Sequence, residues 1–98
     1  MRRITGDGEE RLAFRFSDDC WVEIRDETGR GLYSDLGRGG SHLVLVGQGP
    51  FRILLGYAPG VELAYNGEPL PLAPHTRNNV ATLVLGLYAW WRKEALWS

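Results

Sequence analysis

The chain has 98 residues, of which 44% are hydrophobic and 23% are charged, and its net charge is −1. A chain of this length builds one domain with a modest core. The small net charge argues against a domain-wide basic surface for nucleic acid or an anionic membrane. No apolar run is long enough to cross a bilayer, and the polar start MRRITGDGEE lacks the apolar stretch of a signal peptide.

The first half of the chain predicts a lead-in followed by a hairpin. Residues 1–10 are polar and contain glycine, which predicts a flexible lead-in. Residues 11–17 and 20–26 alternate between apolar and polar side chains, as half-buried strands do. The turn at residues 26–29 suits a three-residue hairpin loop. This loop would pair Ile24 with Leu32 and Cys20 with Leu36.

The second half predicts a compact meander. A glycine-rich turn at residues 36–41 leads into a short strand over 41–46, apolar on both faces. In the stretch 50–72, Asn66-Gly67 is a strong signal for a type I′ hairpin. It would pair Leu63 with Leu70 and Val61 with Leu72. A five-residue loop, 56–60, would pair residues 51–55 with 61–65. The last strand, 79–85, is apolar on both faces and predicts an interior position.

These elements together predict an all-β fold. About seven to eight short strands over residues 11–86 indicate an antiparallel β-sandwich. Residues 87–98 form an aromatic tail with helix-forming residues between Trp90, Trp91 and Trp97. Such a tail predicts a short helix that docks on its own sandwich, on a second copy as a homodimer, or on a membrane surface.

Side chains that could carry chemistry are few. His42 and His75 lie far apart in sequence and lack the spacing of a metal site. The lone cysteine, Cys20, cannot form an internal disulfide, and it falls on an inward strand face, as a small buried hydrophobe does. The adjacent carboxylates at 9–10 and 18–19, and the glycines at 37–40, are typical of turns. The sequence therefore predicts no catalytic residue, no metal site and no cofactor.

Aromatic side chains on the predicted outer face are the candidate site. Trp21 points away from the Cys20, Val22 and Ile24 face, and Tyr33 is predicted nearly across the hairpin from it. Exposed aromatic residues beside arginine are typical of interaction hot spots. The partner-binding candidates are Trp21, Arg25, Tyr33 and Tyr57. The alternative is that another strand or the tail covers these aromatics.

Several short motifs resemble a known family in their order and spacing. They are Cys20-Trp21-Val22-Glu23, Pro50-Phe51 followed by Leu55-Gly56, Val61 before Tyr65-Asn66-Gly67, and Asn79-Val80-Ala81. Residues 11–86 resemble the C-terminal domain of RodZ, the bacterial cell-shape protein. The aromatic tail from Leu87 departs from that family pattern.

The resemblance implies a β-rich domain on the periplasmic side of a single-pass inner-membrane protein. Relatives carry a cytoplasmic helix-turn-helix domain that binds an actin-like protein, then a membrane helix; the expectation is that this chain is an excised domain. It implies a non-catalytic module, without nucleic-acid binding of its own, that couples the cytoskeleton to proteins of the cell-wall elongation complex. The alternative function is a peptidoglycan- or glycan-binding module that stacks sugars on Trp21 and Tyr33.

Overall fold

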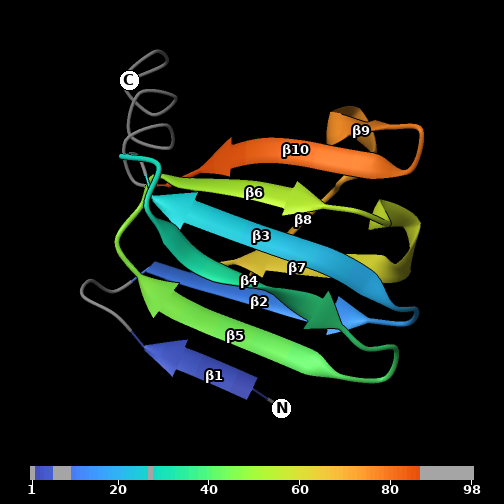
Figure 1. Ribbon diagram of the computed structural model, residues 1–98, viewed down its shortest axis with the longest axis horizontal. Coiled ribbons are helices and arrows are strands. Elements are labelled where there is room, and N and C mark those ends of the chain that lie inside the picture. The colour runs from blue at the N-terminus through green and yellow to red at the C-terminus, as the bar shows by residue number, and fades with distance from the viewer. Residues whose placement is uncertain (1, 6–9, 27, 87–98) are drawn as a thin grey trace.

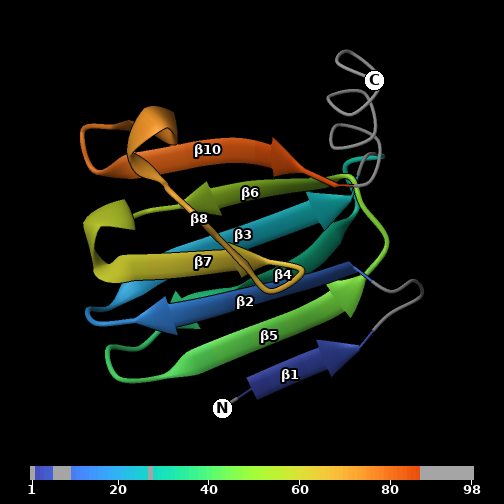
Figure 2. The ribbon, with the colours of Figure 1, turned by 180° about the vertical axis from the view of Figure 1, so that it is seen from behind.

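The computed structural model describes residues 2–5, 10–26 and 28–86, which form two packed β-sheets of five strands each. Sheet A contains β1 (Arg2–Thr5), β5 (His42–Gly47), β2 (Glu10–Phe16), β7 (Val61–Tyr65) and β8 (Glu68–Leu70), in that spatial order. Sheet B contains β4 (Gly31–Gly37), β3 (Cys20–Asp26), β6 (Phe51–Leu55), β10 (Val80–Leu85) and β9 (Thr76–Arg77). Figures 1 and 2 show the two layers from opposite sides. The predicted all-β sandwich is confirmed, with ten strands where seven or eight were expected.

The core lies between the two sheets and follows the alternation seen in the sequence. Along β2 and β3, every second side chain is buried, because successive side chains of a strand point to opposite faces. Both sheets contribute large apolar groups to one continuous cluster. Its largest fully buried members are Leu12, Phe14, Cys20, Val22, Ile24, Phe51 and Leu55.

The hairpin between β7 and β8 is the most accurately predicted element. Leu63 pairs with Leu70 and Tyr65 with Glu68, as the Asn66-Gly67 signal predicts. The φ angles of 51° at Asn66 and 85° at Gly67 are those of a type I′ turn. Pairing stops at Leu70, so the predicted pairing of Val61 with Leu72 does not form. Pro71 follows directly and has no N–H to extend the ladder.

Replacing Gly67 with valine should lower the free energy of unfolding by about 1–2 kcal/mol, because a β-branched residue is forced to positive φ. Nothing lies within 4 Å of a Cβ placed there, so backbone strain alone carries the effect. Urea denaturation measures it. Gly67→Asn is the matched control and should cost much less, since asparagine tolerates this conformation. Equal stability of Gly67→Val and the unaltered chain would contradict the turn assignment.

The predicted pairing of β6 with β7 is wrong. The structure places β6 in sheet B, between β3 and β10, and β7 in sheet A, beside β2. The 3₁₀ turn η1 (Ala58–Gly60) carries the chain from one sheet to the other. Two backbone hydrogen bonds hold this crossing: Ala58 N–H to Asn79 O, at 2.7 Å, and Ser17 N–H to Gly60 O, at 2.8 Å. Both strands still turn their apolar residues to the core, which is why the pattern suggested a common sheet.

The β3–β4 hairpin forms, but its register differs from the prediction by one residue. Ile24 lies opposite Tyr33 and Cys20 opposite Gly37, because a bulge interrupts the ladder between Ile24 and Arg25. The extra residue of a bulge shifts every later pair on that strand. Asp26 organises the turn: its Oδ1 accepts from Thr28 N–H at 2.9 Å and from Arg30 N–H at 2.9 Å. The hydrogen bond from the Thr28 hydroxyl is the main cause that lowers the pKa of this carboxyl. The backbone N–H groups of Arg30 and Thr28 lower it further.

The two chain ends differ from the expectations in separate ways. Within the stretch predicted as a flexible lead-in, the structure describes β1, which pairs in parallel with β5, and it begins β2 at Glu10. The last strand is interior in sheet B, as predicted, but only one of its faces is covered, since Val80 and Val84 are exposed. The strand predicted over 41–46 is β5, whose Val44 is half-buried. The predicted helical tail, 87–98, lies outside the described residues.

Beyond the β7–β8 hairpin, the chain runs obliquely toward the turn η2 (Ala73–His75) and rejoins sheet B at β9 (Figure 2). Leu72 is buried along this path and adds to the core. His75 N–H donates to Leu72 O at 2.9 Å, and the Thr76 hydroxyl donates to the same carbonyl at 2.7 Å. This segment therefore sets η2 beside β10, near the β9 edge of sheet B.

Candidate binding face

The face of β3, β6 and β10 that points away from sheet A is open, and we call it the sheet B face. The inner side chains of these strands are buried in the core, so their sequence neighbours must point outward. Hydrogen-bonded registers then fix which outward residues lie side by side. The outward residues are Trp21, Glu23, Arg25, Arg52, Leu54, Val80, Thr82 and Val84.

One end of the sheet B face is apolar. Trp21 is 42% exposed and lies opposite Leu36 of β4. On its other side, Gly56 N–H donates to Trp21 O at 2.8 Å, and a Cβ added to Gly56 would come within 3.3 Å of the Trp21 Cβ. The β6 position beside Trp21 therefore carries no side chain, and one added there would press against the Trp21 Cβ. On the other side of Gly56, Val80 of β10 completes this end of the face, by continuation of the β6–β10 register.

A row of polar contacts along β3 fixes the orientation of the indole. Trp21 Nε1 donates to Glu23 Oε2 at 2.8 Å, and Glu23 Oε1 forms an ion pair with Arg25 at 3.6 Å. The three residues share the outward face because they are two positions apart. Arg25 also donates from Nη1 to Gly29 O at 3.2 Å. Glu23 therefore links the aromatic end of the face to its basic end.

The structure brings together only part of the predicted partner-binding set. Trp21 and Arg25 lie on the sheet B face, and Tyr57, 38% exposed, follows Gly56 at the same end as Trp21. Tyr33 lies opposite Ile24, whose side chain is in the core, and it packs partly against that core. The bulge, whose extra residue is Leu32 of β4, causes this change of face. A stacking platform made of Trp21 and Tyr33 is therefore not formed.

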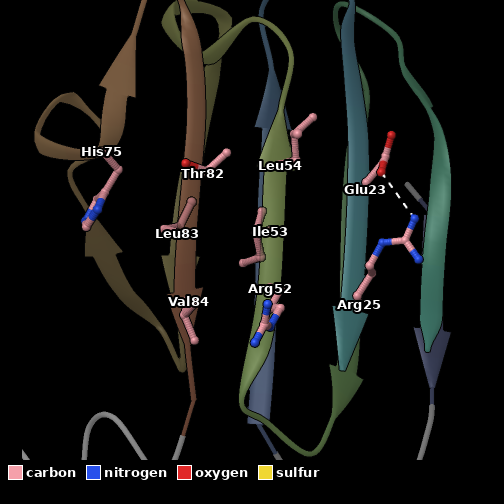
Figure 3. A pocket seen from close by; sticks show the side chains of 9 residues that line it. All are labelled: Glu23, Arg25, Arg52, Ile53, Leu54, His75, Thr82, Leu83 and Val84. Carbon is pink, nitrogen blue, oxygen red and sulfur yellow. Dashed lines mark ion pairs between the residues drawn. The ribbon is translucent and has the colours of Figure 1, made fainter. Parts of the chain in front are cut away.

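The part of the face supplied by β6 and β10 was not predicted from the sequence. Figure 3 shows this part from close by: Arg52 and Leu54 on β6, Thr82 and Val84 on β10, and His75 at the side. They line a shallow hollow of about 520 Å³, together with Glu23 and Arg25. The alternation Phe51-Arg52-Ile53 does indicate that Arg52 points outward. The order of the strands, which the sequence alone does not give, brings Arg52 beside Arg25.

The other residues that could carry chemistry have structural roles. Cys20 is buried; its thiol lies 3.3 Å from Trp21 O and accepts from Tyr57 N–H at 3.2 Å, and burial raises its pKa. Asp19 Oδ1 accepts from Gly39 N–H at 2.8 Å and so joins the β2–β3 turn to the β4–β5 turn. Within residues 2–5, 10–26 and 28–86, no three His, Cys, Asp or Glu side chains lie together as a metal site would require.

One buried carboxylate was not predicted. Glu10 begins β2 and accepts hydrogen bonds from Gly49 N–H, at 2.6 Å to Oε2, and from the Tyr65 hydroxyl. It joins β2, β7 and the loop between β5 and β6. Burial raises the pKa of the Tyr65 phenol well above its usual range, and the Glu10 carboxylate raises it further. No buried side-chain N or O among the described residues lacks a hydrogen-bond partner.

The fold and this face define a compact β-sandwich module whose sheet B face is open, aromatic at one end and basic at the other. In the part of the chain that the structure describes, no helix is long and apolar enough to span a membrane. Residues 13–84 match the family model of the RodZ C-terminal domain. The chain belongs to this family, and the resemblance seen in the sequence is confirmed. No solved structure matches the chain.

Proposed function

We propose that this chain is the non-catalytic, extracytoplasmic interaction module of a RodZ-like cell-shape protein, and that its sheet B face contacts proteins of the cell-wall elongation complex. The family supports a cell-shape role. The observation that carries the proposal is Trp21: a large aromatic side chain, 42% exposed, held in position by Glu23 on an open face. Tryptophan and arginine are enriched among residues that dominate binding energy.

In this proposal the module lies on the periplasmic side of the inner membrane, as part of a single-pass parent protein. It carries the signal from a cytoskeleton-bound cytoplasmic part to the wall-synthesising proteins outside. A face that is already formed and rigid suits this role, because little ordering entropy is lost when a partner docks. Trp21 and Tyr57 provide the apolar contact, while Arg25 and Arg52 provide the charged contact.

A second candidate is a module that binds peptidoglycan glycan strands. The exposed indole of Trp21 favours it, since sugars stack on flat aromatic faces. Because Tyr33 lies toward the core, Trp21 is the aromatic residue that the sheet B face offers for such stacking. The two candidates predict different ligands for the same residues, so one variant tests both.

Replacing Trp21 with alanine should leave the fold intact and weaken capture of purified elongation-complex proteins by about thirtyfold, the effect of losing about 2 kcal/mol at a hot spot. The fold should persist because the side chain lies outside the core. Pull-down and titration measure capture, and sedimentation with purified sacculi measures glycan binding. Glu62→Ala, on the exposed face of sheet A, is the control. Unchanged capture contradicts the proposal, and loss of sacculus binding alone supports the glycan candidate.

A further inference from the structure

Two arginines lie side by side on the sheet B face. Arg25 of β3 is directly opposite Arg52 of β6 in the antiparallel register, so their side chains share the outward face. Arg25 is 54% exposed and has Glu23 as its ion-pair partner, at 3.6 Å. Arg52 is exposed as well, and it makes no ion pair among the described residues. Like charges placed directly opposite in a sheet destabilise it.

The positive charge of this pair is local, because the net charge of the whole chain is −1. Two guanidinium groups and one carboxylate leave this end of the face with a local positive charge. A sequence that keeps a locally unfavourable pair on an exposed face commonly does so at a functional site. Guanidinium groups donate in a planar fork that matches the two oxygens of a carboxylate. The pair therefore suits a ligand that brings a carboxylate.

The surroundings of the pair add an apolar requirement. Leu54 and the 55%-exposed Val84 flank Arg52 within the hollow of about 520 Å³ (Figure 3). Farther along β3 lies Trp21, four residues from Arg25, with the exposed Val80 of β10 at the same end of the face. At about 3.3 Å per residue, the two ends of the face are about 13 Å apart. A ligand that reaches both ends must be extended over about five residues.

We propose that the sheet B face binds an extended, acidic segment of a partner protein. A side-chain carboxylate of this segment lies between Arg25 and Arg52, and a large apolar side chain four residues along packs against Trp21 and Val80. An extended peptide places residues i, i+2 and i+4 on one side, so both groups face the sheet together. The inference rests on the proposed function, because it specifies the partner of the same face.

A protein segment fits these observations better than a glycan strand. Sugar hydroxyls do not require two adjacent guanidinium groups, whereas a carboxylate is bound best by them. The stem peptides of the cell wall also carry carboxylates, but they lack a large apolar side chain at the required distance. Soluble stem peptide is therefore the competing probe in the test.

The test is a titration of the isotope-labelled full chain, followed by NMR. The probe is the peptide acetyl-Glu-Ser-Thr-Ser-Phe-amide, whose only charge is the glutamate. Binding should shift the amide signals of β3, β6 and β10. Arg52→Ala should weaken binding by about tenfold or more, the value of a charge-assisted hydrogen bond. Added salt should also weaken it, because the pair is exposed. The matched control is Arg15→Ala on the opposite sheet, which should bind as the unaltered chain does.

The glutamine version of the probe separates charge from general affinity. It should bind as weakly to the unaltered chain as the glutamate probe binds to Arg52→Ala. Equal binding of the two probes, signal shifts confined to sheet A, or tighter binding of stem peptide than of the probe would each overturn the inference.

Two variants distinguish failure of this inference from failure of the proposed function. If Trp21→Ala abolishes capture of elongation-complex proteins while Arg52→Ala leaves it unchanged, the interaction role stands and the acidic-segment inference is wrong. If the glutamate probe binds with the expected charge dependence while Trp21→Ala leaves capture unchanged, the inference on the face stands and the proposed partners are wrong.

Discussion

Replacing Phe14 with alanine should lower the free energy of unfolding by about 3–5 kcal/mol, the usual loss when a buried phenylalanine is truncated. Phe14 is fully buried on β2, the central strand of sheet A. Its ring is stacked with Phe16, with centroids 6.3 Å apart. Its strand neighbours are Leu43 and Leu63, so truncation opens a cavity lined by three strands. Partial relaxation cannot fill a space bounded by paired backbones.

Such a loss is a large fraction of the stability of a small domain, which is about 5–15 kcal/mol. For a chain of this size, the melting temperature should fall by more than about 12 °C. Calorimetry and urea denaturation provide the measurement. Val84→Ala is the control, because Val84 is exposed on the other sheet, and it should change stability by about 0.5 kcal/mol or less. A Phe14→Ala loss as small as the control's would contradict the core assignment.

Replacing Glu10 with alanine should have the second largest effect, a loss of about 2–4 kcal/mol, because two donors lose their acceptor. Gly49 N–H and the Tyr65 hydroxyl both donate to this carboxylate. A buried donor left without a partner costs about 1–3 kcal/mol. Urea denaturation measures the loss, and Glu10→Gln is the matched control. Glutamine keeps one acceptor oxygen and should recover part of the stability.

A double-mutant cycle with Tyr65→Phe isolates the bond between the two side chains. The double variant should lose less free energy of unfolding than the two single variants lose together, since contacting residues are coupled. The raised pKa of Tyr65 also predicts that the free energy of unfolding depends on pH in the alkaline range. Since the folded state favours the neutral phenol, this stabilisation is complete below about pH 10, the unfolded value, and declines as the pH rises above it. Tyr65→Phe should remove that decline. Additive losses and an unchanged alkaline profile would contradict the bond's role.

Much of the fold could be predicted because the alternation of apolar and polar residues shows which face of a strand is buried. The inward residues of β2 and β3 were identified correctly, and so was the Asn66-Gly67 turn. The same alternation does not show which strand lies beside which. Phe51 and Leu63 both face the core, but they do so from opposite sheets. Two strands that share an apolar face therefore need not share a sheet.

The candidate site could be predicted only where it depends on one strand. Trp21 and Arg25 point outward because Val22 and Ile24 point inward, and the sequence shows this directly. Tyr33 lies on the other face because of the bulge at Leu32 of β4, and that bulge has no clear sequence signal. Arg52 joined the site because β6 lies beside β3, a pairing between segments almost thirty residues apart.

The chain changes sheets between β2 and β3, β4 and β5, β5 and β6, β6 and β7, and β8 and β9. Neither layer can therefore be completed from one contiguous half of the chain, and β10 is needed before β6 has its second neighbour. Pairings this distant in sequence make folding slow and all-or-none. During synthesis, the domain can acquire its binding face only after nearly all of it has left the ribosome. A partner that recognises the face is thus presented with finished molecules and never with partly made ones.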